Sequence, residues 1–496
     1  MSRLSGAHGA LSSLAAVLIS LAGCANLAPD YRQPAAPVPA NFSASFPASG
    51  VPAESQLMAP AIGWREFFVD DRLRRVVETA LANNRDLRVA AFNIELARAQ
   101  YGITRSAAFP AVDIGASASR GRSLGNGSSN AASDAIQSRV SSQYSADLGL
   151  VSYELDFFGR VRNLSDAALE SYFSVEERRR STQISLVAEV ASAWLALQAD
   201  GQRLQLALDT LASQQKSFEL IQRGHALGAQ SGLALAQAQS TVDSARDQVA
   251  AYDAQVEQDR NALTLLAGAS FPDELLPKPQ GTALTAPTAV QLLTPPPGLP
   301  SSVLQQRPDV LAAEHALRAS YADIGAARAA FYPRISLTAA AGTASSNLQG
   351  LFRSGSSTWS FSPSITVPIF NAGANRANLG AAEAQQQIQL AVYEKTLQTA
   401  FREVADALAI RRTLEERSAA QRSLVAANAR SLELSQALFR SGSGAFLDVL
   451  DAQRSLYAVQ QNLIDLQRIE QVNRLTLYKV LGGGWAEQAG SMPAVP

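Results

Sequence analysis

The chain has 496 residues, enough for more than one ordinary domain, and its 42 basic and 43 acidic residues leave a net charge of −1. That balance provides no basic surface of the kind that nucleic-acid binding needs. One cysteine and three histidines exclude both a Cys/His metal site and an internal disulfide within a single chain. Beyond the N-terminal segment there is no apolar run of about 18 residues, so we expect no transmembrane helix.

The N-terminus has the features of a lipoprotein signal peptide, which we assign to residues 1–23. Arg3 precedes an apolar stretch, residues 11–22, that is too short to span a bilayer. Small residues then lead to Cys24, whose thiol would be lipidated and become the mature N-terminus. The alternative is an ordinary signal peptide with an incidental cysteine. Ala25, rather than an aspartate, follows the cysteine and indicates sorting to the outer membrane.

Proline placement divides the rest of the chain. Prolines are frequent in residues 25–62, which are predicted to be an extended linker within an N-terminal linker and equatorial segment over 24–69. They are frequent again in residues 272–308, predicted to be the linker between the two repeats. There is no proline between Pro110 and Pro272, or between Pro368 and Pro493. This pattern predicts two long helical regions. The corresponding segments are a first repeat over 70–271, a second repeat over 309–484 and a C-terminal tail over 485–496.

The two halves match each other at a nearly constant offset, which indicates a duplication. The aligned stretches are Asp86, Arg105 and Phe109-Pro110 with Asp309, Arg328 and Tyr332-Pro333, and Glu189-Val190-Ala191 with Glu403-Val404-Ala405. Gly228 aligns with Gly442, and Gly268 with Gly482. The first half has extra residues between Pro110 and Gly159. Each repeat is therefore predicted to read helix, strand, loop, strand, helix, turn, helix.

Four segments alternate apolar and polar residues, as β-strands with two different faces do. They lie at about 110–120, 143–156, 333–344 and 357–369, with a helix over 86–108 before the first and a Gly/Ser/Asn-rich loop over 121–142. Trp359 and Phe361 alternate with Ser360 and Ser362. Such faces fit the wall of a transmembrane β-barrel or, equally well, a half-buried soluble sheet.

Four strands per chain cannot close a barrel, because about eight are needed and open edges are not tolerated in lipid. If the strands lie in a membrane, the chain must oligomerise. Two copies would supply eight strands and three would supply twelve, and the residues alone do not choose between them.

Long helices with glycine-rich interruptions predict two helical hairpins. The first covers about 158–268 with a tip at 224–232, and the second about 372–481 with a tip at 440–445. Apolar residues at 3-4 spacing, such as Val190, Trp194 and Leu197, are typical of coiled-coil packing. The tip glycines also fit a GxxxG association motif, but their polar flanks favour a turn.

Several stretches together resemble the TolC-type outer-membrane efflux ducts, in particular the NodT/OprM-like lipoprotein branch that works with RND pumps. The resemblance covers almost the whole mature chain. The stretches are Pro29-Asp30-Tyr31, Trp64-Arg65-Glu66-Phe67-Phe68, Asn84-Arg85-Asp86-Leu87-Arg88, Arg307-Pro308-Asp309-Val310, Ala329-Ala330-Phe331-Tyr332-Pro333 and Phe446-Leu447-Asp448-Val449-Leu450-Asp451-Ala452-Gln453.

This resemblance implies a mainly α protein with membrane β structure: a trimer with a twelve-stranded outer-membrane barrel continued by a long periplasmic α-barrel. Residues 24–69 would contribute to an equatorial girdle. The implied function is a passive exit duct for small toxic compounds or drugs. A periplasmic adaptor and an inner-membrane RND pump are the implied partners. No cofactor is expected other than the lipid on Cys24.

The resemblance also assigns functional residues. Asp448 and Asp451 map to acidic rings at the periplasmic aperture, and spacing i,i+3 places them on one helix face. The alternative is that both are solvated aspartates on a helix surface and form no ring. Phe439 and Gly444 stand where the family's polar latch often has Tyr and Arg, so closure would depend more on packing by Phe439 and Phe446. The adaptor-docking residues would be those of the tips, namely Gly224, Gly228, Gly232, Gly442, Ser443 and Gly444.

Three other functions compete with this one. An exit duct for an ABC-type protein or peptide exporter is the alternative, and Cys24 argues against it. A periplasmic coiled-coil adaptor is disfavoured by the strands around Trp359 and by the duplication. An enzyme is not expected, because no nucleophile motif, P-loop or metal set appears. With three methionines there is no methionine ladder to suggest copper export.

Overall fold

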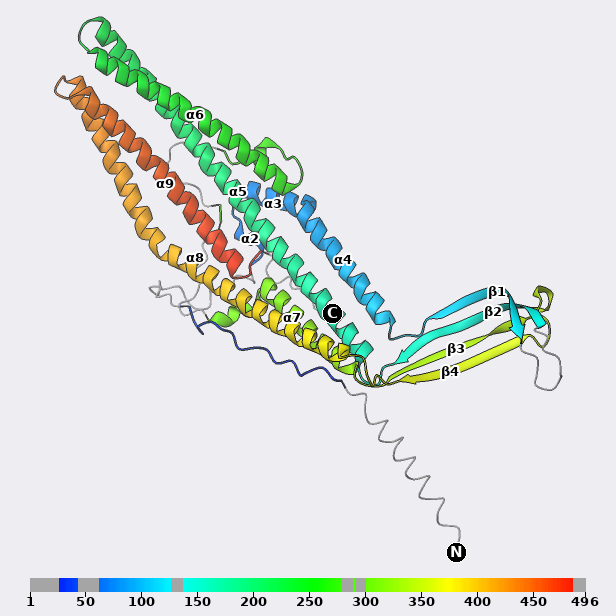
Figure 1. The fold of residues 1–496 in the computed structure, drawn as a ribbon. Coiled ribbons are helices and arrows are strands. Elements are labelled where there is room, and N and C mark those ends of the chain that lie inside the picture. The colour runs from blue at the N-terminus through cyan, green and yellow to red at the C-terminus, as the bar shows by residue number, and fades with distance from the viewer. Residues whose placement is uncertain (1–25, 43–61, 126–136, 279–288, 291–299, 485–496) are drawn as a thin grey trace. The chain divides into compact units, whose positions relative to one another are not determined.

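The computed structural model describes residues 26–42, 62–125, 137–278, 289–290 and 300–484. Its elements in chain order are α2 (Trp64–Phe67), α3 (Asp71–Asn83), α4 (Arg85–Ser106), β1 (Val112–Gly125), β2 (Gln137–Leu155), α5 (Arg160–Ala226), α6 (Gly232–Ala267), η3 (Asp273–Leu275), η4 (Ser301–Gln306), α7 (Pro308–Ala329), β3 (Arg334–Ser345), η5 (Leu348–Gly350), β4 (Ser357–Thr366), α8 (Ala374–Arg440) and α9 (Phe446–Val480) (Figure 1). The predicted signal peptide, Cys24 and the C-terminal tail lie outside the described residues.

The chain divides into two compact units. The sheet unit consists of the N-terminal residues up to Pro34, Glu95–Ser174 and Ala313–Tyr393. The hairpin unit consists of Ala35–Ile94, Val175–Ala312 and the chain from Glu394 onward. Each repeat therefore contributes to both units, as a duplicated chain does when equivalent segments pack together.

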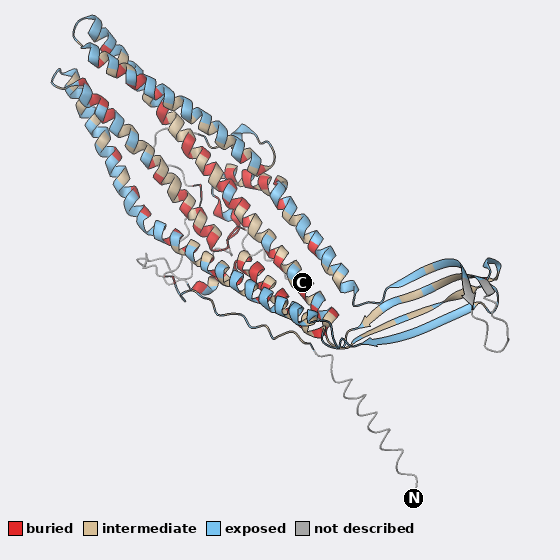
Figure 2. Ribbon diagram, in the orientation of Figure 1, coloured by how far each residue is buried: buried red, intermediate tan, exposed pale blue. Residues whose placement is uncertain are grey.

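The sheet unit contains one antiparallel sheet in the order β1-β2-β3-β4, in which β1 and β4 are the edges. The register places apolar side chains of all four strands on one face. Ile114 pairs with Leu148, which pairs with Ala341, which pairs with Trp359. Trp359 is 82% exposed, so none of the described residues covers this face at that position. All of β4 is exposed (Figure 2). Serines such as Ser336 and Ser364, with their hydroxyl oxygens 2.8 Å apart, lie on the opposite face.

Two features of the sheet differ from the sequence prediction. The loop expected over 121–142 was wrong at both ends, because residues 121–125 continue β1 and residues 137–142 begin β2. Main-chain hydrogen bonds form this ladder, so its Gly/Ser-rich composition does not prevent pairing. The irregular alternation of β2 has a second cause: the register shifts between Leu150 and Tyr153, and Ser152 has φ 42°. This bulge keeps both flanking side chains on the apolar face.

The hairpin unit contains most of the two helical hairpins, α5 with α6 and α8 with α9; α5 up to Ser174 and α8 up to Tyr393 belong to the sheet unit (Figure 1). Side chains bridge the helices within each hairpin. Thr241 of α6 donates to Gln214 of α5 over 3.0 Å, and Gln421 of α8 donates to the Val459 carbonyl of α9 over 2.9 Å. No helix in the described ranges is long and apolar enough to cross a membrane.

The core of the hairpin unit gathers around α2, α3 and the C-terminal end of α9. Phe67 is fully buried and stacks on Tyr478 with ring centroids 3.9 Å apart. The Tyr478 hydroxyl donates to the Ile62 carbonyl over 2.7 Å. Burial raises the pKa of this tyrosine well above its usual value. The short α2 segment is therefore part of the core of the hairpin unit.

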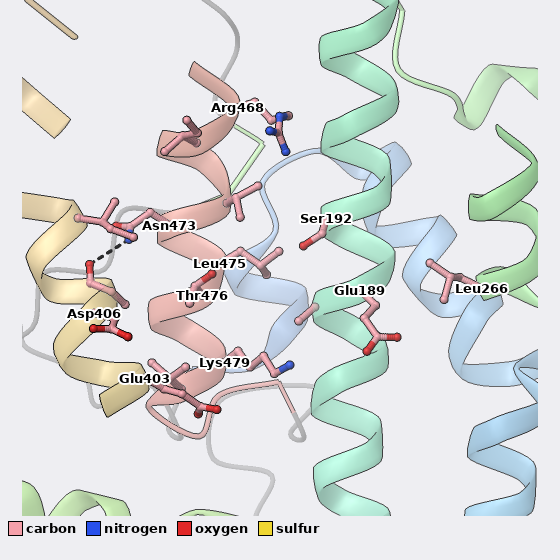
Figure 3. Close-up of a pocket in the computed structure, with 16 residues that line it drawn as sticks. Glu189, Ser192, Leu266, Glu403, Asp406, Arg468, Asn473, Leu475, Thr476 and Lys479 are labelled. Atoms are coloured by element: carbon pink, nitrogen blue, oxygen red, sulfur yellow. Dashed lines mark hydrogen bonds between the residues drawn. The ribbon is translucent and has the colours of Figure 1, made fainter. Parts of the chain in front are cut away.

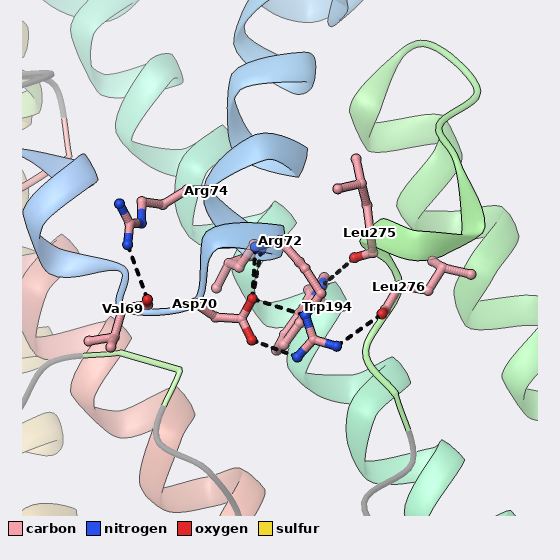
Figure 4. A network of polar contacts seen from close by, with 8 residues as sticks. Val69, Asp70, Arg72, Arg74, Trp194, Leu275 and Leu276 are labelled. Atoms are coloured by element: carbon pink, nitrogen blue, oxygen red, sulfur yellow. Dashed lines mark hydrogen bonds and ion pairs between the residues drawn. The ribbon is translucent and has the colours of Figure 1, made fainter.

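A polar network fixes α3 and the inter-repeat segment against α5 (Figure 4). Asp70 caps α3 by accepting from the backbone N–H of Arg72, and its carboxylate also pairs with the Arg72 guanidinium at 2.7 Å. Burial alone would raise the pKa of Asp70, but these bonds from Arg72 lower it below its usual value. Trp194, fully buried on α5, donates its indole N–H to the Leu275 carbonyl over 3.3 Å.

In the sheet unit, the first described residues pack on α7. The Tyr31 hydroxyl donates to Glu314 over 3.0 Å, and the Arg318 guanidinium lies 4.9 Å from the centre of the Tyr31 ring. Near the end of α7, Arg328 donates to the Leu27 carbonyl over 3.3 Å. Leu27 and Tyr31 are thus both held against α7.

Candidate functional site

The tips of the two hairpins have closely similar backbones. The first tip follows α5 at Ala226 and the second follows α8 at Arg440. Gly228 has φ +75° and its repeat counterpart Gly442 has φ +77°. Residues with a side chain rarely adopt this left-handed conformation, so glycine lets each helix turn back without strain.

The other predicted docking residues lie at the same two tips. Gly224 is in the last turn of α5, and Gly232 is the first residue of α6. Ser443 is exposed in the second tip. A Cβ at Gly444 would stand 2.9 Å from the Leu438 Cβ, so the tight second turn leaves no room there for a larger residue.

An apolar cluster joins the two tips to each other. Phe446 packs with Ile221, Val449 and Leu450 and with two alanines of α6, and Phe439 lies against this group. The rings of Phe439 and Phe446 have centroids 5.4 Å apart. Phe446 is only 8% exposed, so within one chain it packs between the hairpins rather than facing solvent.

Asp448 and Asp451 lie on the opposite, exposed face of the first turns of α9. The Asp448 carboxylate accepts from the Ala445 N–H over 3.3 Å and so helps to begin the helix. Asp451 is 3.5 Å from the Arg454 guanidinium. Exposed pairs of this kind contribute about 0.5 kcal/mol at most, so both carboxylates can interact with solutes.

Farther from the tips, polar contacts connect the two hairpins. Arg203 of α5 pairs with Asp465 of α9 at 2.6 Å, and Gln461 of α9 donates to the Tyr252 hydroxyl of α6 over 2.8 Å. Burial and the neighbouring Tyr252 raise the pKa of Tyr457 to about 12. These contacts hold α9 against both helices of the first hairpin.

Arg307 is a structural anchor to which the sequence pattern assigned no role. It is 9% exposed and binds Asp309 with two nitrogens, at 3.0 and 2.7 Å. It also donates to Glu403 of α8 over 2.9 Å and to the Val480 carbonyl at the end of α9 over 3.0 Å. The start of α7 is thereby fixed to the second hairpin. The Arg-Pro-Asp run at the start of α7 is the sequence signal that could have pointed to this anchor.

A duplicated hairpin fold attached to a sheet with an uncovered apolar face defines the class of outer-membrane channels. Comparison with known proteins agrees. The family model described as "Outer membrane efflux protein" matches residues 76–269 and 299–483. The chain therefore belongs to the outer membrane efflux protein family.

Individual relatives and solved structures show which members of this family the chain resembles. It is 47% identical over 480 residues to the probable efflux pump outer membrane protein TtgC of Pseudomonas putida, covering 97% of this chain and 96% of that one. It is 42% identical over 468 residues to the cation efflux system protein CusC of Escherichia coli, covering 94% and 98%. The open-state MtrE channel of Neisseria gonorrhoeae superposes with a TM-score of 0.83 at 36% identity, covering 94% of this chain and all of that one.

The chain is accordingly an outer-membrane component of an efflux system, and its family consists of channel proteins rather than enzymes. Among the described residues no group of three or more His, Cys, Asp or Glu side chains is placed to hold a metal ion.

Proposed function

We propose that three copies of the chain close into one passive duct, through which an inner-membrane RND pump expels small toxic compounds or drugs. The observation that carries this proposal is the four-stranded sheet with two free edges. In lipid, unpaired backbone groups on β1 and β4 are too costly to remain open. Pairing of β1 with β4 of the next copy satisfies both edges, and three copies give twelve strands.

An exposed apolar stripe on α4 supports contact between copies. Val89, Phe92, Leu96 and Ile103 follow helical spacing along one side of the helix, and each is more than half exposed in the single chain. Such a stripe normally packs against another helix. Because α4 leads directly into the edge strand β1, a neighbouring copy that pairs with β1 is well placed to cover it.

The partners are proposed from the tips and from the relatives. TtgC is named as a probable efflux pump outer membrane protein and CusC as part of a cation efflux system. At the first tip Leu227 and Leu233 are 84% and 69% exposed. Apolar side chains at a turn that none of the described residues covers are suited to binding another protein, here a periplasmic adaptor.

Crosslinking from the second tip tests the partner assignment. Ser443→Cys introduces a thiol into a chain whose only other cysteine is Cys24. A photoactivatable thiol reagent in living cells, followed by mass spectrometry, is expected to capture a periplasmic adaptor together with an RND pump. Capture of the adaptor of an ABC exporter would instead support the alternative, a duct for protein or peptide secretion.

The matched control is Ser423→Cys. Ser423 is also exposed on α8, about 25 Å from the tip at 1.5 Å per residue. Capture from residue 443 but not from residue 423 is expected. Equal capture from both positions, or from neither, would contradict docking at the tip.

A lipid anchor on Cys24 is part of the same proposal. Leu27, three residues later, is bound to Arg328 near the end of α7, and β3 begins a few residues beyond that helix. Three extended residues span about 10 Å, so a lipid on Cys24 would be tethered close to the start of the sheet.

Intact-mass measurement of the purified mature protein checks the anchor. The wild-type chain is expected to carry the mass of a diacylglyceryl group and one further acyl chain. Cys24→Ser is expected to lose all of it, because serine provides no thioether. An unchanged lipid mass on the serine variant would refute the assignment.

We also propose that the periplasmic aperture is lined by Asp448 and Asp451. Both carboxylates are exposed on one face of α9, and three copies would bring six of them to one constriction. A ring of carboxylates attracts cations and resists anions. Phe439 and Phe446 would support the closed form by packing, through the cluster that joins the tips.

A further inference from the structure

A large groove lies between the two hairpins, away from the tips (Figure 3). Its volume is about 830 Å³, within the range of small-molecule sites. Residues of α5, α8 and α9 form its walls, and Leu266 of α6 borders it. Ile410, Ile469, Val472 and Leu475 provide much of the apolar lining.

The duplication places equivalent positions on facing walls. Glu189 and Ser192 of α5 line the groove, and so do their repeat counterparts Glu403 and Asp406 of α8. The groove therefore lies at the junction of the two hairpins of one chain. All of its lining residues belong to the hairpin unit.

The acidic side chains of the groove differ in whether they have an ion-pair partner. Glu403 already binds Arg307. Glu189 and Asp406 are exposed, and neither has an ion-pair partner among the residues that the structure describes. Two carboxylates on different helices are thus available to a solute in the groove.

Asn473 adds a buried hydrogen-bond acceptor, its amide oxygen, that is unsatisfied. It is 5% exposed, lines the groove and donates its amide N–H to the Ala407 carbonyl over 2.9 Å. Its Oδ1 atom is buried and has no hydrogen-bond partner among the described residues. A buried amide oxygen is nearly always satisfied, so this one indicates a donor that is supplied from the groove.

The two basic residues that line the groove do not reverse its preference for cationic solutes. Figure 3 shows Arg468 and Lys479 at opposite ends of the groove, with Asn473 between them. Arg468 is only 3.5 Å from Asp465, which also pairs with Arg203 at 2.6 Å, so the positive charges of Arg468 and Lys479 remain but lie at the two ends of the groove. The middle of the groove therefore presents acceptors and apolar surface together.

We propose that this groove is a binding site for amphipathic cations that carry N–H donors, such as protonated aminoacridines. The apolar lining would cover the hydrocarbon body, and Glu189 and Asp406 would attract the charge. An N–H group of the solute would donate to Asn473 Oδ1. This inference rests on the proposed function, in which such solutes pass through the duct.

The test is equilibrium binding of proflavine, a fluorescent aromatic cation with amino groups, to the assembled full-length channel in nanodiscs. Saturable binding is expected for the wild type. The double variant Glu189→Gln with Asp406→Asn is expected to bind about tenfold more weakly, the effect of removing two partly exposed charge attractions. Both substitutions are at exposed positions and keep the side-chain shape, so folding is not at risk.

Two controls define the outcome. Glu416→Gln removes an exposed carboxylate of α8 outside the groove and is expected to leave proflavine affinity unchanged. Neutral 7-amino-4-methylcoumarin is expected to bind the wild type and the double variant equally. No saturable proflavine binding, or equal affinity in all variants, would overturn the site.

Bilayer conductance of the same preparations separates this inference from the proposed function. A conducting channel that does not bind proflavine would remove the site and leave the duct intact. A preparation that binds proflavine with the expected variant pattern but conducts no current would support the site and contradict the duct.

Discussion

Replacement of Arg307 by leucine is expected to destabilise the hairpin unit by about 3 kcal/mol. The arginine is buried, and leucine cannot replace its bonds to Asp309, Glu403 and the Val480 carbonyl. Both carboxylates are a little over one third exposed, so they can be partly rehydrated, which keeps the cost at the lower end of the range for broken buried pairs. Urea unfolding followed by tryptophan fluorescence measures the change.

Trp64 and Trp194 both lie in the hairpin unit and report on it directly. Arg412→Leu is the matched control, because Arg412 is an exposed arginine of α8. Its effect is expected to stay within about 0.5 kcal/mol. If both variants unfold at the same urea concentration as the wild type, Arg307 does not anchor α7 to the second hairpin.

The double variant Asp448→Asn with Asp451→Asn is expected to lower the cation-to-anion preference of the assembled channel about fivefold. That factor corresponds to roughly 1 kcal/mol of lost attraction at the constriction. Asparagine at 448 still offers an oxygen to the Ala445 N–H, so the start of α9 is retained. The reversal potential across a planar bilayer with a KCl gradient gives the preference.

Asp243→Asn is the control for this experiment. Asp243 is on α6, 56% exposed and paired with Arg246 at 3.1 Å, which closely matches Asp451 and its partner Arg454. No change in reversal potential is expected for it. An unchanged potential in the double variant would remove these aspartates from the aperture, and an equal change in the control would show that any acidic residue of the hairpins acts alike.

Local chemistry made much of the architecture predictable. Proline and glycine act on the backbone of their own segment, so the proline-free stretches and the tip glycines indicated α5, α6, α8 and α9. Gly228 and Gly442 are the clearest case, since both have the left-handed backbone that glycine permits. Period-two alternation likewise indicated β3 and β4, whose register now places Ile335 opposite Ile365 on one face.

Residue composition predicted the structure less well where pairing between strands determines it. Residues 121–125 and 137–142 were expected to be loop, yet they form strand because a partner strand supplies main-chain hydrogen bonds. The bulge at Ser152 also depends on pairing with β3. Residue type alone carries little information about either feature.

The sequence by itself determined the duplication, the order of helices and strands, and the two glycine turns, because each depends on residues near one another in the chain. Only the tertiary structure decided what Arg307 and Phe446 contact and where Asn473 has an unused acceptor. Those properties arise between helices that are far apart in sequence. Burial and hydrogen bonding there depend on which side chains meet, and a linear pattern does not specify that.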